Sequence, residues 1–215
     1  MALLFFILHY KLPKLRPHFP GSYGSLLKSI WHYFKTEPAL RVASLRGALG
    51  FAGLSAFWTT LVFLMEDNFG YGSTAAGLFG LFGIAGALGA TVVGKLNDKI
   101  KKNKIIVLAT LLMIVSWIIF LFSTYSLIGL IVGVILVDLG LQGLHITNQN
   151  IIFSKNPEGR NRVNTVYMVS FFIGGAIGTT LGAYAWENFH WVGVSMLGLV
   201  LSVLILIVHL LFRRI

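Results

Sequence analysis

The basic residues of this chain gather in every second gap between long apolar segments. Apart from Arg46, the 17 Lys and Arg residues lie within 11–41, 95–104, 155–162 and 213–214. The gaps at 66–72, 123–126 and 187–190 contain no Lys or Arg. In membrane proteins the cytoplasmic loops are enriched in Lys and Arg, whereas the loops on the other side are not. The alternation therefore predicts a chain that crosses a bilayer repeatedly, with its linker and its C-terminus on the cytoplasmic side.

The composition indicates that most of the chain lies in lipid. Hydrophobic residues make up 56% of the sequence and charged residues only 11%, with a mean hydropathy of +0.82. In soluble domains about a quarter of the residues are charged. A net charge of +10 would suggest a nucleic-acid partner in a soluble protein, but these cations lie in loops on one side of a membrane. We therefore expect the lipid bilayer as a partner and no nucleic acid.

The sequence offers no chemistry for an enzyme. It contains no cysteine, which excludes a disulfide framework and a thiolate metal site. Its loops contain no nucleophile paired with a base, no phosphate-binding glycine loop and no cluster of metal ligands. We therefore expect no enzymatic activity, no cofactor and no metal.

Six segments are long and apolar enough to be membrane-spanning helices, which require roughly 20 residues each. They cover residues 40–65, 73–93, 105–122, 127–153, 163–186 and 191–212. Residues 39–215 are therefore expected to form an all-α, six-helix membrane domain. The start of its first helix is indicated by a Thr cap, an early acid and a Pro in the first turn, at Thr36, Glu37 and Pro38.

The residues before that domain divide into two parts. Residues 1–10 are apolar but only about half as long as a span, which suggests the last turns of a preceding helix. Residues 11–38 form a basic linker, expected on the cytoplasmic side. Its stretch 26–35 is amphipathic and aromatic, which suits a position along the membrane surface.

The fourth span carries polar residues along one stripe. Asp138 lies near its middle, and Gln142, His145 and Gln149 follow at helical spacing, with Asn148 beside them. An ionisable residue at this depth costs about 2.5–3.5 kcal/mol, so such residues usually mark a pathway. A carboxylate and an imidazole on one face can carry protons, because His titrates near neutral pH. The stripe predicts the wall of a wet proton or substrate pathway; the alternative is an interhelical hydrogen-bond network.

Other polar groups in the spans have two interpretations each. Arg46, in the first span, either meets an anionic group in the pathway or reaches along the helix to the cytoplasmic interface. Trp58, Thr59 and Tyr167 are candidate substrate contacts, although residues of these types in a span are more often packing groups.

Small residues recur at intervals of four in two spans. Gly86 is followed by Ala90 and Gly94, and the fifth span repeats the spacing at Gly174, Gly178 and Gly182. Helices in lipid associate closely where small residues let their backbones touch. We expect these positions to be helix-packing surfaces; the alternative is that they also slide or rock.

The loop at 94–102 resembles the G-x-L-x-D-R-x-G-R/K-R/K loop of the major facilitator superfamily. Gly94 and Asp98 match, whereas Lys99 replaces the usual Arg and Lys101 the second Gly, as in the degraded copy of the C-terminal half. Residues 138–149, 160–168 and 172–178 are similar to a bacterial branch of the drug:proton antiporter type. The resemblance extends over spans seven to twelve of that family and most of this chain.

This resemblance implies an alternating-access transporter in the bacterial inner membrane, with two six-helix halves that rock around a central site. Each half consists of two three-helix inverted repeats, and residues 1–10 would be the end of span six. Gly94, Asp98, Lys99 and Lys102 would belong to the cytoplasmic gate, the alternative being a basic turn that only sets topology. The implied function is proton-coupled efflux of a small molecule.

A single half would expose its polar face to lipid, so the chain is expected to need a second half. It is interpreted as the product of an interrupted gene, as a separately encoded half that pairs with an N-terminal six-helix half, or as one that pairs with a second copy of itself. The first is favoured, because a dedicated half would have little use for residues 1–10. The functional alternative to transport is a membrane anchor or scaffold.

Overall fold

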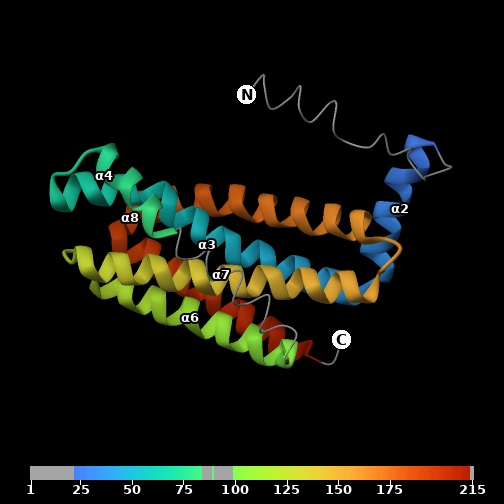
Figure 1. Ribbon diagram of the computed structural model, residues 1–215. Helices are drawn as coiled ribbons and strands as arrows, with labels where there is room; N and C mark the ends of the chain where they lie inside the picture. Colours follow the sequence, from blue (N-terminus) through green and yellow to red (C-terminus); the bar gives the residue numbers. More distant parts are fainter. Residues whose placement is uncertain (1–21, 84–88, 90–98, 214–215) are drawn as a thin grey trace, which may run out of the picture.

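The described part of the structure, a computed structural model, consists of α-helices and their connections (Figure 1). It comprises residues 22–83, 89 and 99–213. The helices are α2 (Tyr23–Thr36), α3 (Pro38–Phe69), α4 (Ser73–Leu78), α6 (Lys102–Phe122), α7 (Leu127–Lys155) and α8 (Arg160–Leu211). Four of them, α3, α6, α7 and α8, are long and apolar enough to cross a membrane. The expected all-α membrane fold is confirmed.

Helix α8 contains two spans rather than one. Its 52 residues would extend about 78 Å if they were straight, whereas the hydrocarbon core of a bilayer is about 30 Å thick. At His190 the backbone leaves the helical conformation, with φ 51° and ψ −148°. Figure 1 shows the orange first part of α8 run to one end of the bundle and the red second part return. The reversal lies between the expected spans 163–186 and 191–212.

The backbone conformation of His190 gives a direct test of this reversal. Positive φ combined with such a ψ is a region that essentially only glycine occupies without strain, at a cost of about 1–3 kcal/mol for other residues. We expect His190→Gly to raise the midpoint of thermal unfolding, measured on purified protein in one detergent. The same change at the exposed Asn188, in the last turn before the reversal, should lower it, because it removes the hydrogen bond from the Asn188 amide to the carbonyl of Tyr184 and glycine is a poor helix former. A lower midpoint for His190→Gly would contradict the positive-φ conformation assigned to His190.

The described parts of the basic segments meet at one end of the bundle. Figure 1 shows α2, the starts of α3, α6 and α8, and the ends of α7 and α8 at that end. The turns that follow α3 and α6 lie at the opposite end, together with the reversal of α8. Every second connection therefore returns to the same end, as the alternation of Lys and Arg predicts for a chain threaded through a bilayer.

Helices α3 and α8 approach each other along a seam of glycine and alanine. A Cβ added to Gly174, Gly178 or Gly182 would come within 2.6, 2.5 or 2.7 Å, respectively, of the Cα atom of Ala48, Ala52 or Ala56. These distances leave no room for a side chain, so the two backbones are in contact. Both sets of residues repeat every four positions, which keeps each on one face of its helix.

An aromatic cluster lies beside this seam, toward the end of the bundle opposite the basic one. Trp117 and Phe120 on α6 are fully buried, and Phe57 on α3 stacks on Phe120 with ring centroids 4.7 Å apart. Trp191, at the start of the second part of α8, donates its indole N–H to the backbone carbonyl of Phe120 at 2.8 Å. The residue that follows the reversal of α8 is thus anchored to α6 by packing and a hydrogen bond.

The segments before the first long helix differ in part from the expectation. Helix α2 lies across the basic end, where Tyr33 contacts Gly159 just before α8. The expected Thr36 cap is wrong: Thr36 belongs to α2 and donates its hydroxyl to His32, and Glu37 is the residue that precedes α3. Pro38 is the first residue of α3, a position where its missing N–H costs nothing.

Several expected features lie outside the described residues. The remnant helix at 1–10 and residues 11–21 of the linker are among them, as are Gly86 and the second half of the span expected at 73–93. Of that span the structure describes α4 and the helical turn that continues it to Gly83, together with Gly89.

Candidate functional site

The polar stripe of the fourth span lies on α7, an uninterrupted helix of 29 residues. Asp138 is about 17 Å from the start of this helix, close to its middle. Its side chain is half-buried, and a Cβ added to Gly83 would come within 3.1 Å of its carboxylate Oδ2. Asp138 therefore faces the continuation of α4. Gln142, one turn further on, is also half-buried.

His145 contacts the first part of α8. Its Nδ1 atom lies 3.0 Å from the hydroxyl of Tyr167, and its ring lies against Phe171 with centroids 4.8 Å apart. Tyr167 is fully buried, and its hydroxyl would lie 2.8 Å from a Cβ on Gly47 of α3. A glycine at position 47 is what lets the tyrosine reach across α3 to the histidine.

Asn148 and Gln149 cross-link α7 to two different helices. The buried Asn148 donates its amide N–H to the carbonyl of Ala43 on α3 at 3.3 Å. Gln149 donates to the side-chain oxygen of Asn164 on α8 at 3.3 Å. Asn164 was not among the residues singled out from the sequence. Its spacing of three residues from Tyr167, on one helical face, is the signal that could have found it.

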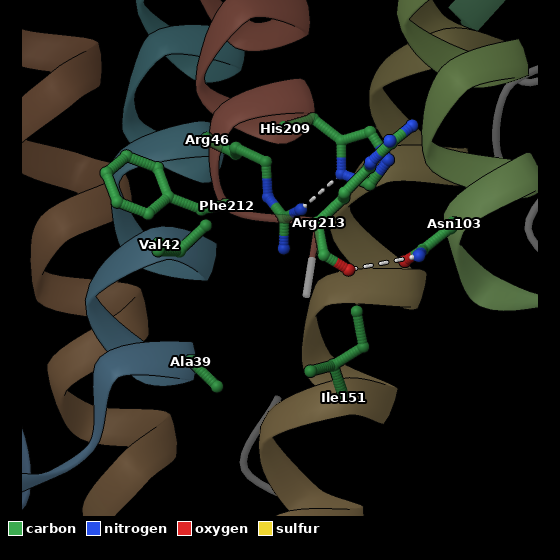
Figure 2. A pocket seen from close by; sticks show the side chains of 8 residues that line it. All are labelled: Ala39, Val42, Arg46, Asn103, Ile151, His209, Phe212 and Arg213. Carbon is green, nitrogen blue, oxygen red and sulfur yellow. Dashed lines mark hydrogen bonds between the residues drawn. The ribbon is translucent and has the colours of Figure 1, made fainter. Parts of the chain in front are cut away.

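Arg46 points into the bundle rather than along its surface (Figure 2). Only 4% of the residue is exposed, and its Nη1 atom lies 2.9 Å from Nδ1 of His209 on the second part of α8. Guanidinium groups only donate hydrogen bonds, so Nδ1 is the acceptor and carries no proton.

The described ionisable residues form two hydrogen-bonded pairs that join different helices. His145 of α7 bonds Tyr167 of α8, and Arg46 of α3 bonds His209 of the second part of α8. Asp138 belongs to neither pair, since it lies two turns before His145 on α7 and faces the continuation of α4. His209 was missed from the sequence, although an ionisable residue inside the apolar run 199–212 carries the same signal as Asp138.

The remaining site predictions are placed as follows. Gly94 and Asp98 of the gate loop lie outside the described residues, and Lys99 is exposed at the basic end. Lys102 donates to the carbonyl of Asn150 and to the hydroxyl of Ser154, so it joins the start of α6 to the end of α7. Trp58 is half-buried, and Thr59 bonds Thr179 across the α3–α8 seam at 3.2 Å.

Long apolar helices with ionisable side chains in their interiors define a multi-pass membrane protein. Comparison with known proteins extends this result. The sequence model of the Major Facilitator Superfamily matches two overlapping stretches, residues 1–179 and 43–215. The chain belongs to the major facilitator superfamily.

Three relatives are themselves named as transporters. The uncharacterized transporter YgaY of Escherichia coli O157:H7 is 39% identical over 97% of this chain and 53% of its own length. A Streptomyces coelicolor protein named as a transporter is 32% identical over 86% of this chain and 43% of its own length. An uncharacterized transporter of Buchnera aphidicola is 22% identical over 95% of this chain and 50% of its own length. The chain thus spans about half the length of these relatives.

Proposed function

We propose that this chain supplies one six-helix half of a secondary transporter that exports a small molecule in exchange for protons. The observation that carries the proposal is Asp138, a half-buried carboxylate at the middle of a 29-residue apolar helix. An ionisable carboxylate at this depth is energetically costly in lipid, so such a group is expected to face other protein or water. The relatives named as transporters support transport, and their length, about twice that of the matched region, supports a second half.

The polar face of α7 supports a role at the centre of such an assembly. Asp138, Gln142, His145 and Gln149 all remain half-buried within the described part of the chain. A second half placed against this face would enclose the four side chains in a cavity near the midplane, where transporters of this architecture bind substrate. The proposed location is the bacterial inner membrane, with the basic end in the cytoplasm.

Reconstitution tests the proposal. The chain is placed in liposomes alone, and in parallel together with the portion of the Escherichia coli relative that has no counterpart in this chain. A pH gradient is imposed, and export of a panel of small lipophilic dyes, ethidium among them, is measured by fluorescence. We expect gradient-driven flux of at least one dye from the combined preparation, abolished by a protonophore.

The outcomes separate the possible roles. Flux from the combined preparation alone supports a half that needs a different second half. Flux from the chain alone supports pairing with a second copy. Absence of flux from both, with folded protein shown by circular dichroism and size exclusion, would contradict the transport proposal and favour an anchor or scaffold.

A further inference from the structure

A small cavity lies at the basic end of the bundle, and its described lining includes cations but no carboxylate. It lies between α3, α6, α7 and α8 and has a volume of about 40 Å³ (Figure 2). Arg46, His209, Arg213 and Asn103 supply its polar groups, and its other lining residues are apolar. A water needs about 10–15 Å³ of such volume, so the cavity has room for about three or four waters or a group of similar size.

The cavity contains a donor that the described protein does not satisfy. Only 4% of Arg46 is exposed, and its Nε atom has no hydrogen-bond partner among the described residues. An unsatisfied buried donor costs about 1–3 kcal/mol, and more when it is charged. His209 cannot neutralise the guanidinium, because its Nδ1 accepts as an uncharged imidazole. No described carboxylate offsets the positive charge of Arg46, which favours an anionic group in or beside the cavity.

The position of Arg213 is fixed at the rim of the cavity. Asn103 at the start of α6 donates its side-chain amide to the backbone carbonyl of Arg213 at 3.2 Å. This bond holds the end of α8 beside α6, and the Arg213 side chain extends past His209 at the rim of the cavity. Guanidinium groups present several N–H donors that match phosphate oxygens.

A second, apolar groove continues from the cavity along the outer surface of the bundle. The two share Asn103, His209 and Arg213. The groove has a volume of about 360 Å³ and runs between α6 and α8, where it is lined by Lys104, Val107, Leu108, Leu111 and Leu210. Lys104 adds a cation near the shared end, and the leucines are 44–59% exposed toward the surrounding lipid.

We propose that this cavity and groove bind one anionic phospholipid. The phosphate group lies at the basic end, where Arg46, Arg213 and Lys104 supply positive charge, and an acyl chain lies in the groove between α6 and α8. Basic pockets between membrane helices are a recurrent mode of recognition for anionic headgroups. The groove favours a lipid over free phosphate, because a free anion would leave the adjoining apolar surface unused. This inference does not depend on transport.

Native mass spectrometry of the full chain in detergent tests the assignment. Binding of phosphatidylglycerol is compared with that of phosphatidylcholine carrying the same acyl chains. We expect Arg213→Gln to weaken phosphatidylglycerol binding about fivefold, the effect of one basic residue near an anionic surface. Arg160→Gln is the matched control, because it removes an exposed arginine at the same end but outside the cavity. Both substitutions are on exposed side chains, so folding is not at risk.

The acyl-chain part of the proposal has its own variant. Leu111→Asn, in the groove, should weaken binding of phosphatidylglycerol, whereas Val132→Asn, at a similar exposure on α7, should not. Equal binding of the two lipids with no effect of Arg213→Gln would overturn the proposal. So would full competition by millimolar inorganic phosphate together with no effect of Leu111→Asn, since that result would describe a site for free anions.

Discussion

Replacing Asp138 with Asn is expected to reduce proton-driven export about tenfold or more in the combined preparation that transports. Asn keeps the size of the side chain and its hydrogen-bonding capacity but has no proton to release. The half-buried position of Asp138 facing α4 suggests that the substitution leaves the packing of α7 intact. The measurement is the initial rate of dye export under an imposed pH gradient, normalised to the amount of folded protein.

Two controls make the Asp138 result specific. Asp67→Asn makes the same chemical change at an exposed position near the end of α3 and should leave the rate unchanged. Asp138→Glu restores a titratable carboxylate and should recover part of the rate. If Asp138→Asn exports dye with undiminished dependence on the gradient, Asp138 is not the proton carrier, although the chain can still be part of a transporter.

A leucine at position 178 should prevent the bundle from assembling. Even the Cβ atom of such a side chain would lie 2.5 Å from the Cα of Ala52 and closer to its carbonyl oxygen. The neighbouring atoms belong to the backbone, which cannot rotate away as a side chain can. The loss of stability should therefore exceed the 1–3 kcal/mol that overpacking typically causes. We expect little or no monodisperse Gly178→Leu protein by size exclusion of detergent-solubilised membranes.

The matched control is Gly77→Leu on α4. A Cβ at Gly77 meets nothing within 4 Å, and leucine is a better helix former than glycine by several tenths of a kcal/mol. This variant should elute as the unaltered protein does, with an equal or higher thermal midpoint. Normal yield and stability of Gly178→Leu would show that α3 and α8 do not meet at this seam.

The helices were largely predictable because apolar length and loop charge are local properties of the sequence. The span expected at 105–122 is α6 from Lys102, and the span expected at 127–153 is α7 to Lys155. Each helix extends beyond the apolar segment to include a basic residue, because a helix need not end at the boundary of the hydrocarbon core. The expected Thr36 cap was wrong because the hydroxyl of Thr36 forms its hydrogen bond within the preceding helix α2 and not with the start of α3.

The candidate site was less predictable, because its contacts join residues that are distant in the sequence. The stripe on α7 follows from helical spacing, but spacing cannot show that His145 meets Tyr167 or that Asp138 faces α4. Arg46 and His209 are separated by 163 positions. Two interpretations of Arg46 remained open because burial depends on the packing of α3 against α8, which a single sequence does not specify.

The glycine and alanine seam also limits how this half can deform. The small residues of α3 and α8 interlock at intervals of four, or about 6 Å along each axis. A shift by less than one interval would drive the larger neighbouring side chains of each helix into the backbone of the other. Helix α3 and the first part of α8 can therefore rotate together as one rigid unit, but they resist sliding past each other.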